Sequence, residues 1–94
     1  MKTIEGFRLR KLGNEYILVG ESMELINFNK MITLNETAAF LWQQAESSSV
    51  AHGGFTASDL CKALCNEYDV DPAQAMTDVD NTVKAWLEAG VIAE

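Results

Sequence analysis

The chain has 94 residues, of which 48% are hydrophobic, and a formal net charge of −7. This length suits one small domain and is short for an enzyme that needs a walled active-site cavity. The sequence shows neither a basic leader followed by an apolar run nor an apolar run long enough to span a bilayer, so we expect a cytoplasmic protein that does not associate with membranes.

The charged residues are distributed unevenly along the chain. Residues 1–34 carry five basic and four acidic side chains, whereas residues 35–94 carry two basic and ten acidic ones. An acidic half repels nucleic-acid phosphates and anionic lipid surfaces. A basic partner therefore suits it better than a nucleic acid or a membrane.

The first third of the sequence has the patterns of β-strands. Apolar and basic side chains alternate from Phe7 to Leu12, Gly13-Asn14 signals a tight turn, and residues 15–19 resume as an extended run. These features predict a hairpin with one solvent-exposed face.

Two further extended runs follow the hairpin. Residues 24–28 form one run, Asn29-Lys30 resembles a turn, and Met31 to Leu34 form a short strand. We therefore expect a small antiparallel sheet of three or four strands over about residues 7–34. An uncovered edge of such a sheet can accept another strand.

The strand that ends at Leu34 passes directly into the first of three predicted helices. Asn35 is a good N-cap, and apolar residues recur at helical spacing after it. The pattern predicts a helix over about residues 36–45, followed by a loop rich in serine and glycine at residues 46–54.

The two later helices have clear local start signals. Thr56 and Asp59 suggest a capping box for a helix at about residues 57–68. Asp71 as N-cap and Pro72 at the first helical position begin a helix over about residues 72–89.

A glycine and an apolar pair close the sequence. Gly90 is a natural helix stop, and we expect Val91-Ile92 to pack back onto the core or the sheet. Taken together, the elements predict an α+β fold of winged helix-turn-helix type, with a small N-terminal antiparallel sheet followed by a three-helix bundle.

No constellation of residues predicts catalysis or metal binding. The sequence lacks a phosphate-binding loop, a dinucleotide fingerprint, a nucleophile elbow and a histidine-rich motif. Cys61 and Cys65 have no second pair to complete a zinc site, and His52 is the only histidine. We predict that the protein is not an enzyme and that it needs no cofactor and no metal ion.

Three binding functions then remain open. An exposed strand edge can bind an extended peptide, with the long helix at residues 72–89 as the other wall of a groove. A winged-helix regulator of nucleic acid is an alternative, although Lys62 and Lys84 are the only basic residues of the helical half. A structural module that pairs its edge with a second copy is the third, so we expect a monomer or a homodimer.

The run from Met31 to Trp42, M-I-T-L-N-E-T-A-A-F-L-W, resembles the Leu-Asn-(Asp/Glu)-Thr-Ala core of PqqD-like proteins. That family takes its name from coenzyme PQQ synthesis protein D, and its members are also called RiPP precursor-peptide recognition elements. Four later groups of residues resemble the family in order and spacing: Asp59-Leu60 with Leu64, Tyr68 to Asp71, Asp78-Val79 with Trp86-Leu87, and Gly90 to Ile92.

The resemblance implies a peptide chaperone without catalytic activity of its own. Such proteins bind the leader of a ribosomally made precursor peptide and present it to a modifying enzyme such as a radical S-adenosylmethionine (radical SAM) protein, in PQQ synthesis or another RiPP pathway. The leader adds as a strand to the sheet edge and lies against the third helix.

Carried over by position, the resemblance implies a single PqqD-like domain over residues 1–94. The sheet supplies one wall of the peptide groove. The inward stripe of the third helix must be shared between the core and the opposite wall. The peptide-binding residues implied in this way are Met31, Ile32, Thr33, Leu34, Leu25, Phe28, Val79, Val83 and Trp86.

Overall fold

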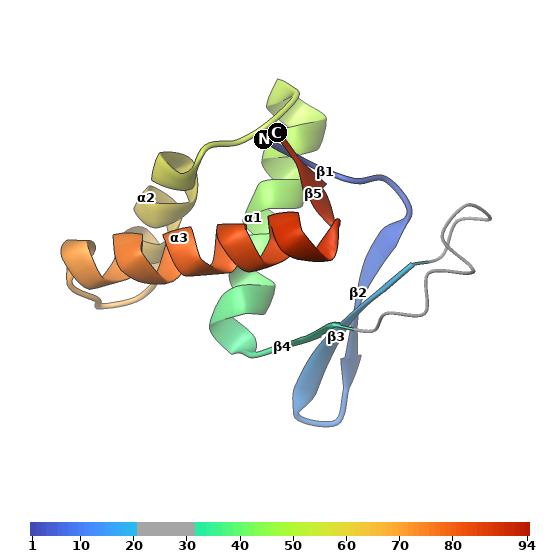
Figure 1. Ribbon diagram of the computed structural model, residues 1–94. Coiled ribbons are helices and arrows are strands. Elements are labelled where there is room, and N and C mark those ends of the chain that lie inside the picture. Colours follow the sequence, from blue (N-terminus) through green and yellow to red (C-terminus); the bar gives the residue numbers. More distant parts are fainter. Residues whose placement is uncertain (21–31) are drawn as a thin grey trace.

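The computed structural model describes residues 1–20 and 32–94 (Figure 1). Antiparallel strands are followed by three helices, so the predicted α+β fold is confirmed. The predicted strand at residues 24–28 and the turn at Asn29-Lys30 lie outside the described residues. The described elements are β1 (Lys2–Thr3), β2 (Phe7–Leu12), β3 (Glu15–Gly20), β4 (Ile32–Leu34), α1 (Glu36–His52), α2 (Ala57–Glu67), α3 (Pro72–Ala89) and β5 (Ile92–Ala93).

The predicted hairpin forms two strands of a three-stranded sheet with the order β2-β3-β4. Leu9 lies opposite Leu18, and Ile17 lies opposite Thr33. Because side chains alternate between the faces of a strand, the buried residues Phe7, Leu18 and Leu34 all face the helices.

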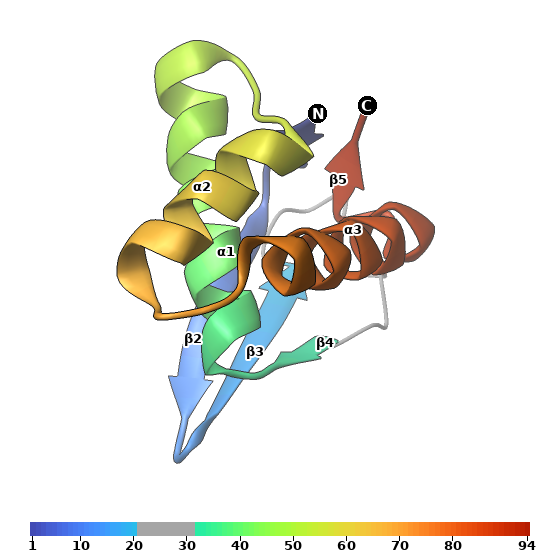
Figure 2. The same ribbon diagram turned by 90° about the vertical axis from the view of Figure 1, so that its left-hand side faces the viewer.

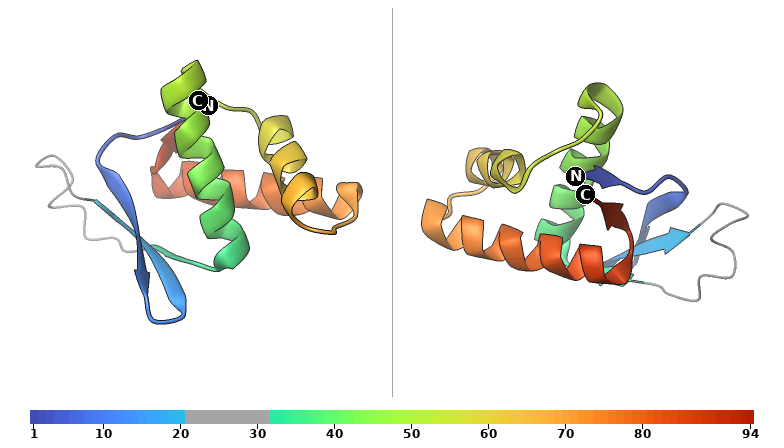
Figure 3. Two further views of the ribbon diagram at one scale, coloured as in Figure 1. Left: turned by 180° about the vertical axis from the view of Figure 1, so that it is seen from behind. Right: turned by 45° about the horizontal axis from the view of Figure 1, so that its top comes forward.

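α1 lies between the sheet and α2 in Figures 1 and 3, and α2 packs against α3. Trp42 of α1 and Trp86 of α3 meet edge to face, with ring centroids 5.4 Å apart. Both indoles are buried, which makes this pair the centre of the core. None of the described helices combines the length and the apolar character needed to cross a membrane.

A second, two-stranded sheet joins the ends of the described chain. β1 pairs antiparallel with β5, and the Ile4 amide donates to the Val91 carbonyl at 3.0 Å. Val91 and Ile92 are buried, so the prediction that they pack back onto the core is confirmed. The strand β1 was not predicted, because a run of two residues is too short to show a β-strand pattern.

The first helix is longer than predicted, because α1 continues to His52 through most of the expected loop. The Ser49 hydroxyl donates to the Ala45 carbonyl at 2.8 Å and accepts the Thr3 amide at 3.0 Å. Serine favours loops when its side chain competes for local backbone groups, but here β1 satisfies that side chain while the helix continues. Gly53, at a φ of 76°, then ends the helix.

The bridge through Ser49 predicts a measurable cost for its removal. Ser49→Ala loses the acceptor of the Thr3 amide, and we expect the free energy of unfolding to fall by about 1 kcal/mol in urea denaturation. Ser47→Ala is the matched control because this serine is exposed on the same helix and gains the same helix propensity. Equal stability of the two variants would contradict the bridging role of Ser49.

Candidate functional site

The three-stranded sheet has β2 at one outer edge and β4 at the other. In the part of the chain that the structure describes, β4 pairs only with β3, so its outer edge has no strand partner. Ile32 is half-buried, Thr33 is exposed and Leu34 is buried. The main chain of this strand can therefore pair with an added strand while the side chain of Leu34 stays in the core.

A cavity of about 390 Å³ opens beside the end of β4, between the start of α1 and the middle of α3. We call it the β4–α3 cleft. Figures 1 and 2 show β4 beneath α3 in both views. Asn35, Thr37, Ala38 and Leu41 line one side of the cleft, and Asp78, Asn81 and Thr82 line the other.

The polar side chains of this cleft are held by local hydrogen bonds. Asn35 Oδ1 accepts the Ala38 amide at 2.8 Å, which caps α1. Gln74 Nε2 donates to Asp78 Oδ1 at 3.0 Å, and Thr82 Oγ1 donates to the Asp78 carbonyl at 2.8 Å. The wall that α3 contributes is thus partly preorganised.

The helix residues named from the sequence do not line this cleft. Val79, Val83 and Trp86 are only 0%, 7% and 3% exposed, so the structure assigns them to the core. Of the implied sheet residues, Ile32, Thr33 and Leu34 lie on β4. Met31, Leu25 and Phe28 lie outside the described residues.

The sequence reasoning missed Asp78, Asn81 and Thr82, which lie next to the buried stripe of α3. Their spacing of three and four residues places them on one face of a helix. That spacing is a usable signal, but a polar helical face is usually only solvated. This face differs from an ordinary solvated face because it lies opposite the start of α1. That position depends on how the helices pack.

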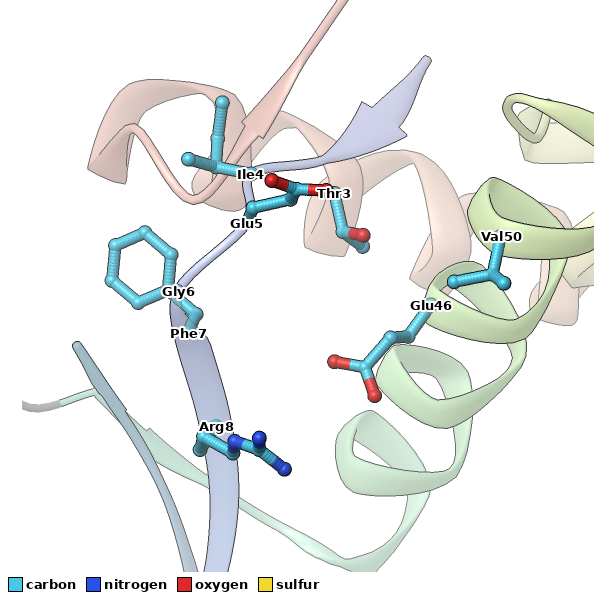
Figure 4. Close-up of a pocket in the computed structure, with 8 residues that line it drawn as sticks. All are labelled: Thr3, Ile4, Glu5, Gly6, Phe7, Arg8, Glu46 and Val50. Carbon is cyan, nitrogen blue, oxygen red and sulfur yellow. The ribbon is translucent and has the colours of Figure 1, made fainter. Parts of the chain in front are cut away.

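A larger cavity of about 560 Å³ lies at the other edge of the sheet, between the start of β2 and α1. Figure 4 shows Arg8 and Glu46 extending from these two elements into the same space. Val50, which is 86% exposed, also lines it. This cavity therefore accompanies the β2 edge and not the edge beside α3.

A smaller cavity of about 150 Å³ is lined by aromatic residues from three parts of the chain. Tyr16 comes from β3, Phe40 from α1 and Tyr68 from the end of α2, and Glu36, Ala39 and Gln43 complete the lining. We call it the aromatic pocket. The rings of Phe40 and Tyr68 meet edge to face with centroids 5.6 Å apart.

The charges around the aromatic pocket affect its tyrosine. Partial burial raises the pKa of Tyr68 above its usual value, and the carboxylates of Glu36 and Glu67 and the neighbouring Tyr16 raise it further. The phenol of Tyr68 therefore stays neutral at physiological pH, near the carboxylates of Glu36 and Glu67.

The described residues do not assemble a recognisable reactive centre. No three histidine, cysteine, aspartate or glutamate side chains within residues 1–20 and 32–94 group as metal ligands. Burial raises the pKa of the Cys61 thiol, and the neighbouring Cys65 and Asp80 raise it further. A thiol with a raised pKa is protonated at neutral pH and is a poor nucleophile.

Comparison with known proteins identifies a matching family and a solved structure with a similar fold. Residues 15–92 match the family model described as "Coenzyme PQQ synthesis protein D (PqqD)". The solved structure of "TbiB1 in Complex with the TbiA(beta) Leader Peptide" is similar, with a TM-score of 0.68, 18% sequence identity and 100% coverage of both chains. At this identity the likeness establishes a shared fold. No curated protein matched the sequence.

The electrostatics of the aromatic pocket can be tested by titration. Glu36→Gln removes a neighbouring carboxylate, so we expect the pKa of Tyr68 to move down toward 10.0, as followed by NMR of the tyrosine ring carbons. Glu46→Gln, on the same helix, should leave that pKa unchanged.

A raised pKa also means that the folded state holds the phenol proton of Tyr68 more tightly than the unfolded state does. The free energy of unfolding should therefore fall as the pH rises through 10.

Proposed function

The chain belongs to the PqqD family, and from this membership we propose that it is a non-catalytic peptide-binding protein. Its ligand is the leader segment of a ribosomally made precursor peptide, which it presents to a modifying enzyme. The family match over residues 15–92 carries the proposal. The fold shared with TbiB1, which was solved in complex with the TbiA(beta) leader peptide, supports it.

We propose that the leader adds as a strand along the outer edge of β4. Strand addition uses the main-chain amides and carbonyls of an edge, and so tolerates many peptide sequences. Within the described residues, β4 comprises three residues, Ile32–Leu34. At about 0.5–1.5 kcal/mol net for each hydrogen bond, so short an edge supplies modest affinity. Side-chain contacts must therefore supply much of the affinity and the specificity.

The β4–α3 cleft is the proposed source of those side-chain contacts. It begins at Asn35, directly after β4, and its opposite wall is the face of α3 formed by Asp78, Asn81 and Thr82. Alternate side chains of an added strand point to the same side, so a leader residue beside the end of β4 can direct its side chain into the cleft. Among the described residues that line the cleft, Asp78 alone is charged, which favours a leader side chain that donates hydrogen bonds.

The choice of β4 over β2 rests on the position of α3. The resemblance to PqqD-like proteins implies that the leader lies against the third helix. The β4–α3 cleft starts at Asn35, the residue after β4, and has α3 as one of its walls, whereas no residue of α3 lines the cavity at the β2 edge. We therefore place the leader at β4, with Ile32 and Thr33 on the strand side.

The chain is proposed to supply recognition, and a separate enzyme to supply the chemistry. A radical SAM protein is a suitable enzyme of this kind. The product is then PQQ or another modified peptide, and the leader sequence decides which. Presentation in a fixed extended conformation raises the effective concentration of the peptide at the enzyme.

The cleft can be tested by filling it with a neutral side chain. Thr82→Tyr places a bulky ring on the α3 wall, and we expect it to weaken binding about 10-fold or more, since about 1.4 kcal/mol corresponds to tenfold. The titration uses a synthetic leader of the precursor peptide encoded beside the gene, followed by isothermal calorimetry.

Val50→Tyr is the matched control, because it introduces the same ring at the cavity beside β2. It should leave the affinity for the leader unchanged. If Val50→Tyr abolished binding and Thr82→Tyr did not, the leader would lie at the β2 edge and the proposed site would be wrong.

A further inference from the structure

The aromatic pocket is a second cavity whose chemistry the binding of a leader at β4 does not use. Three aromatic rings and one carboxylate converge there from elements that are distant in sequence: β3, the start of α1 and the end of α2. Its volume of about 150 Å³ suits a single side chain and not a peptide segment or a large cofactor.

The faces of aromatic rings attract cations, and one of the three rings already has a cation beside it. Lys11 Nζ lies 5.8 Å from the centroid of the Tyr16 ring, within the range of a cation–π interaction. Lys11 is not among the residues that line the pocket, so the pocket itself stays open to another group.

The charges near the pocket favour the same class of ligand. Glu36 lines the cavity, and Glu67 is close enough to help raise the pKa of Tyr68. A carboxylate or phosphate would meet repulsion here, whereas a guanidinium or ammonium group gains from both the rings and the carboxylates.

The pocket and the β4–α3 cleft use opposite sides of α1. Glu36, Phe40 and Gln43 line the pocket, while Thr37, Ala38 and Leu41 line the cleft. At about 100° per residue, the centres of these two sets lie about 140° apart around the helix. A group bound in the pocket therefore leaves the cleft free.

We propose that the aromatic pocket is a binding site for the arginine or lysine side chain of a partner protein, used at the same time as the β4–α3 cleft. The partner presents one cationic side chain to Tyr16, Phe40 and Tyr68, and Glu36 pairs with its charge. The site thus gives the partner a contact that does not compete with a bound peptide.

The test uses N-acetyl-argininamide as the probe and the neutral isostere N-acetyl-citrullinamide as its control, in NMR titrations without leader peptide. We expect ring resonances of Tyr16, Phe40 and Tyr68 to shift with the arginine compound and much less with the citrulline compound. Glu36→Gln should weaken binding about 2- to 5-fold, the range of an exposed cation–π pair with its charge partner. Glu46→Gln should have no effect.

Equal shifts with both compounds would overturn the proposal, since charge would then play no part. Shifts spread over the acidic helices, or equal losses in Glu36→Gln and Glu46→Gln, would show general attraction to negative charge and would overturn it as well. The leader peptide is absent from these titrations, so their failure is distinct from a failure of the β4–α3 cleft.

Discussion

The edge-to-face contact of Trp42 with Trp86 joins α1 to α3 in the core, and the β4–α3 cleft depends on this packing. The centroids lie 5.4 Å apart and both rings are buried. The apolar stripe of α3 that points inward makes this contact. The neighbouring face of α3, with Asp78, Asn81 and Thr82, therefore lies opposite the start of α1. The cleft is thus a consequence of core packing.

The direct passage from β4 into α1 provides the second constraint. Asn35 is the single residue between them, and its side chain caps the helix. No loop separates the edge strand from the first turn of α1, so the chain connects the two elements directly. A leader on β4 would therefore meet a cleft whose position relative to the strand is already set, which reduces the ordering cost of binding.

Local signals predicted much of the fold, and long-range contacts explain the rest. Asp71, Pro72 and Gly90 act within one turn of helix, and α3 has the predicted bounds. The end of α1 was missed because Ser49 bonds to Thr3, 46 residues away in sequence. The same limit applies to the site. The residues of α3 that face the core were recognisable from their spacing, but recognising the residues that face the cleft required the position of α1.

The central claim is that an extended leader pairs with β4 and not with β2. Hydrogen exchange of individual main-chain amides, followed by NMR with and without the leader, tests it most directly. We expect slower exchange within Ile32–Leu34 on binding and unchanged exchange within Phe7–Leu12. Protection confined to β2, or binding without protection in either strand, would contradict it.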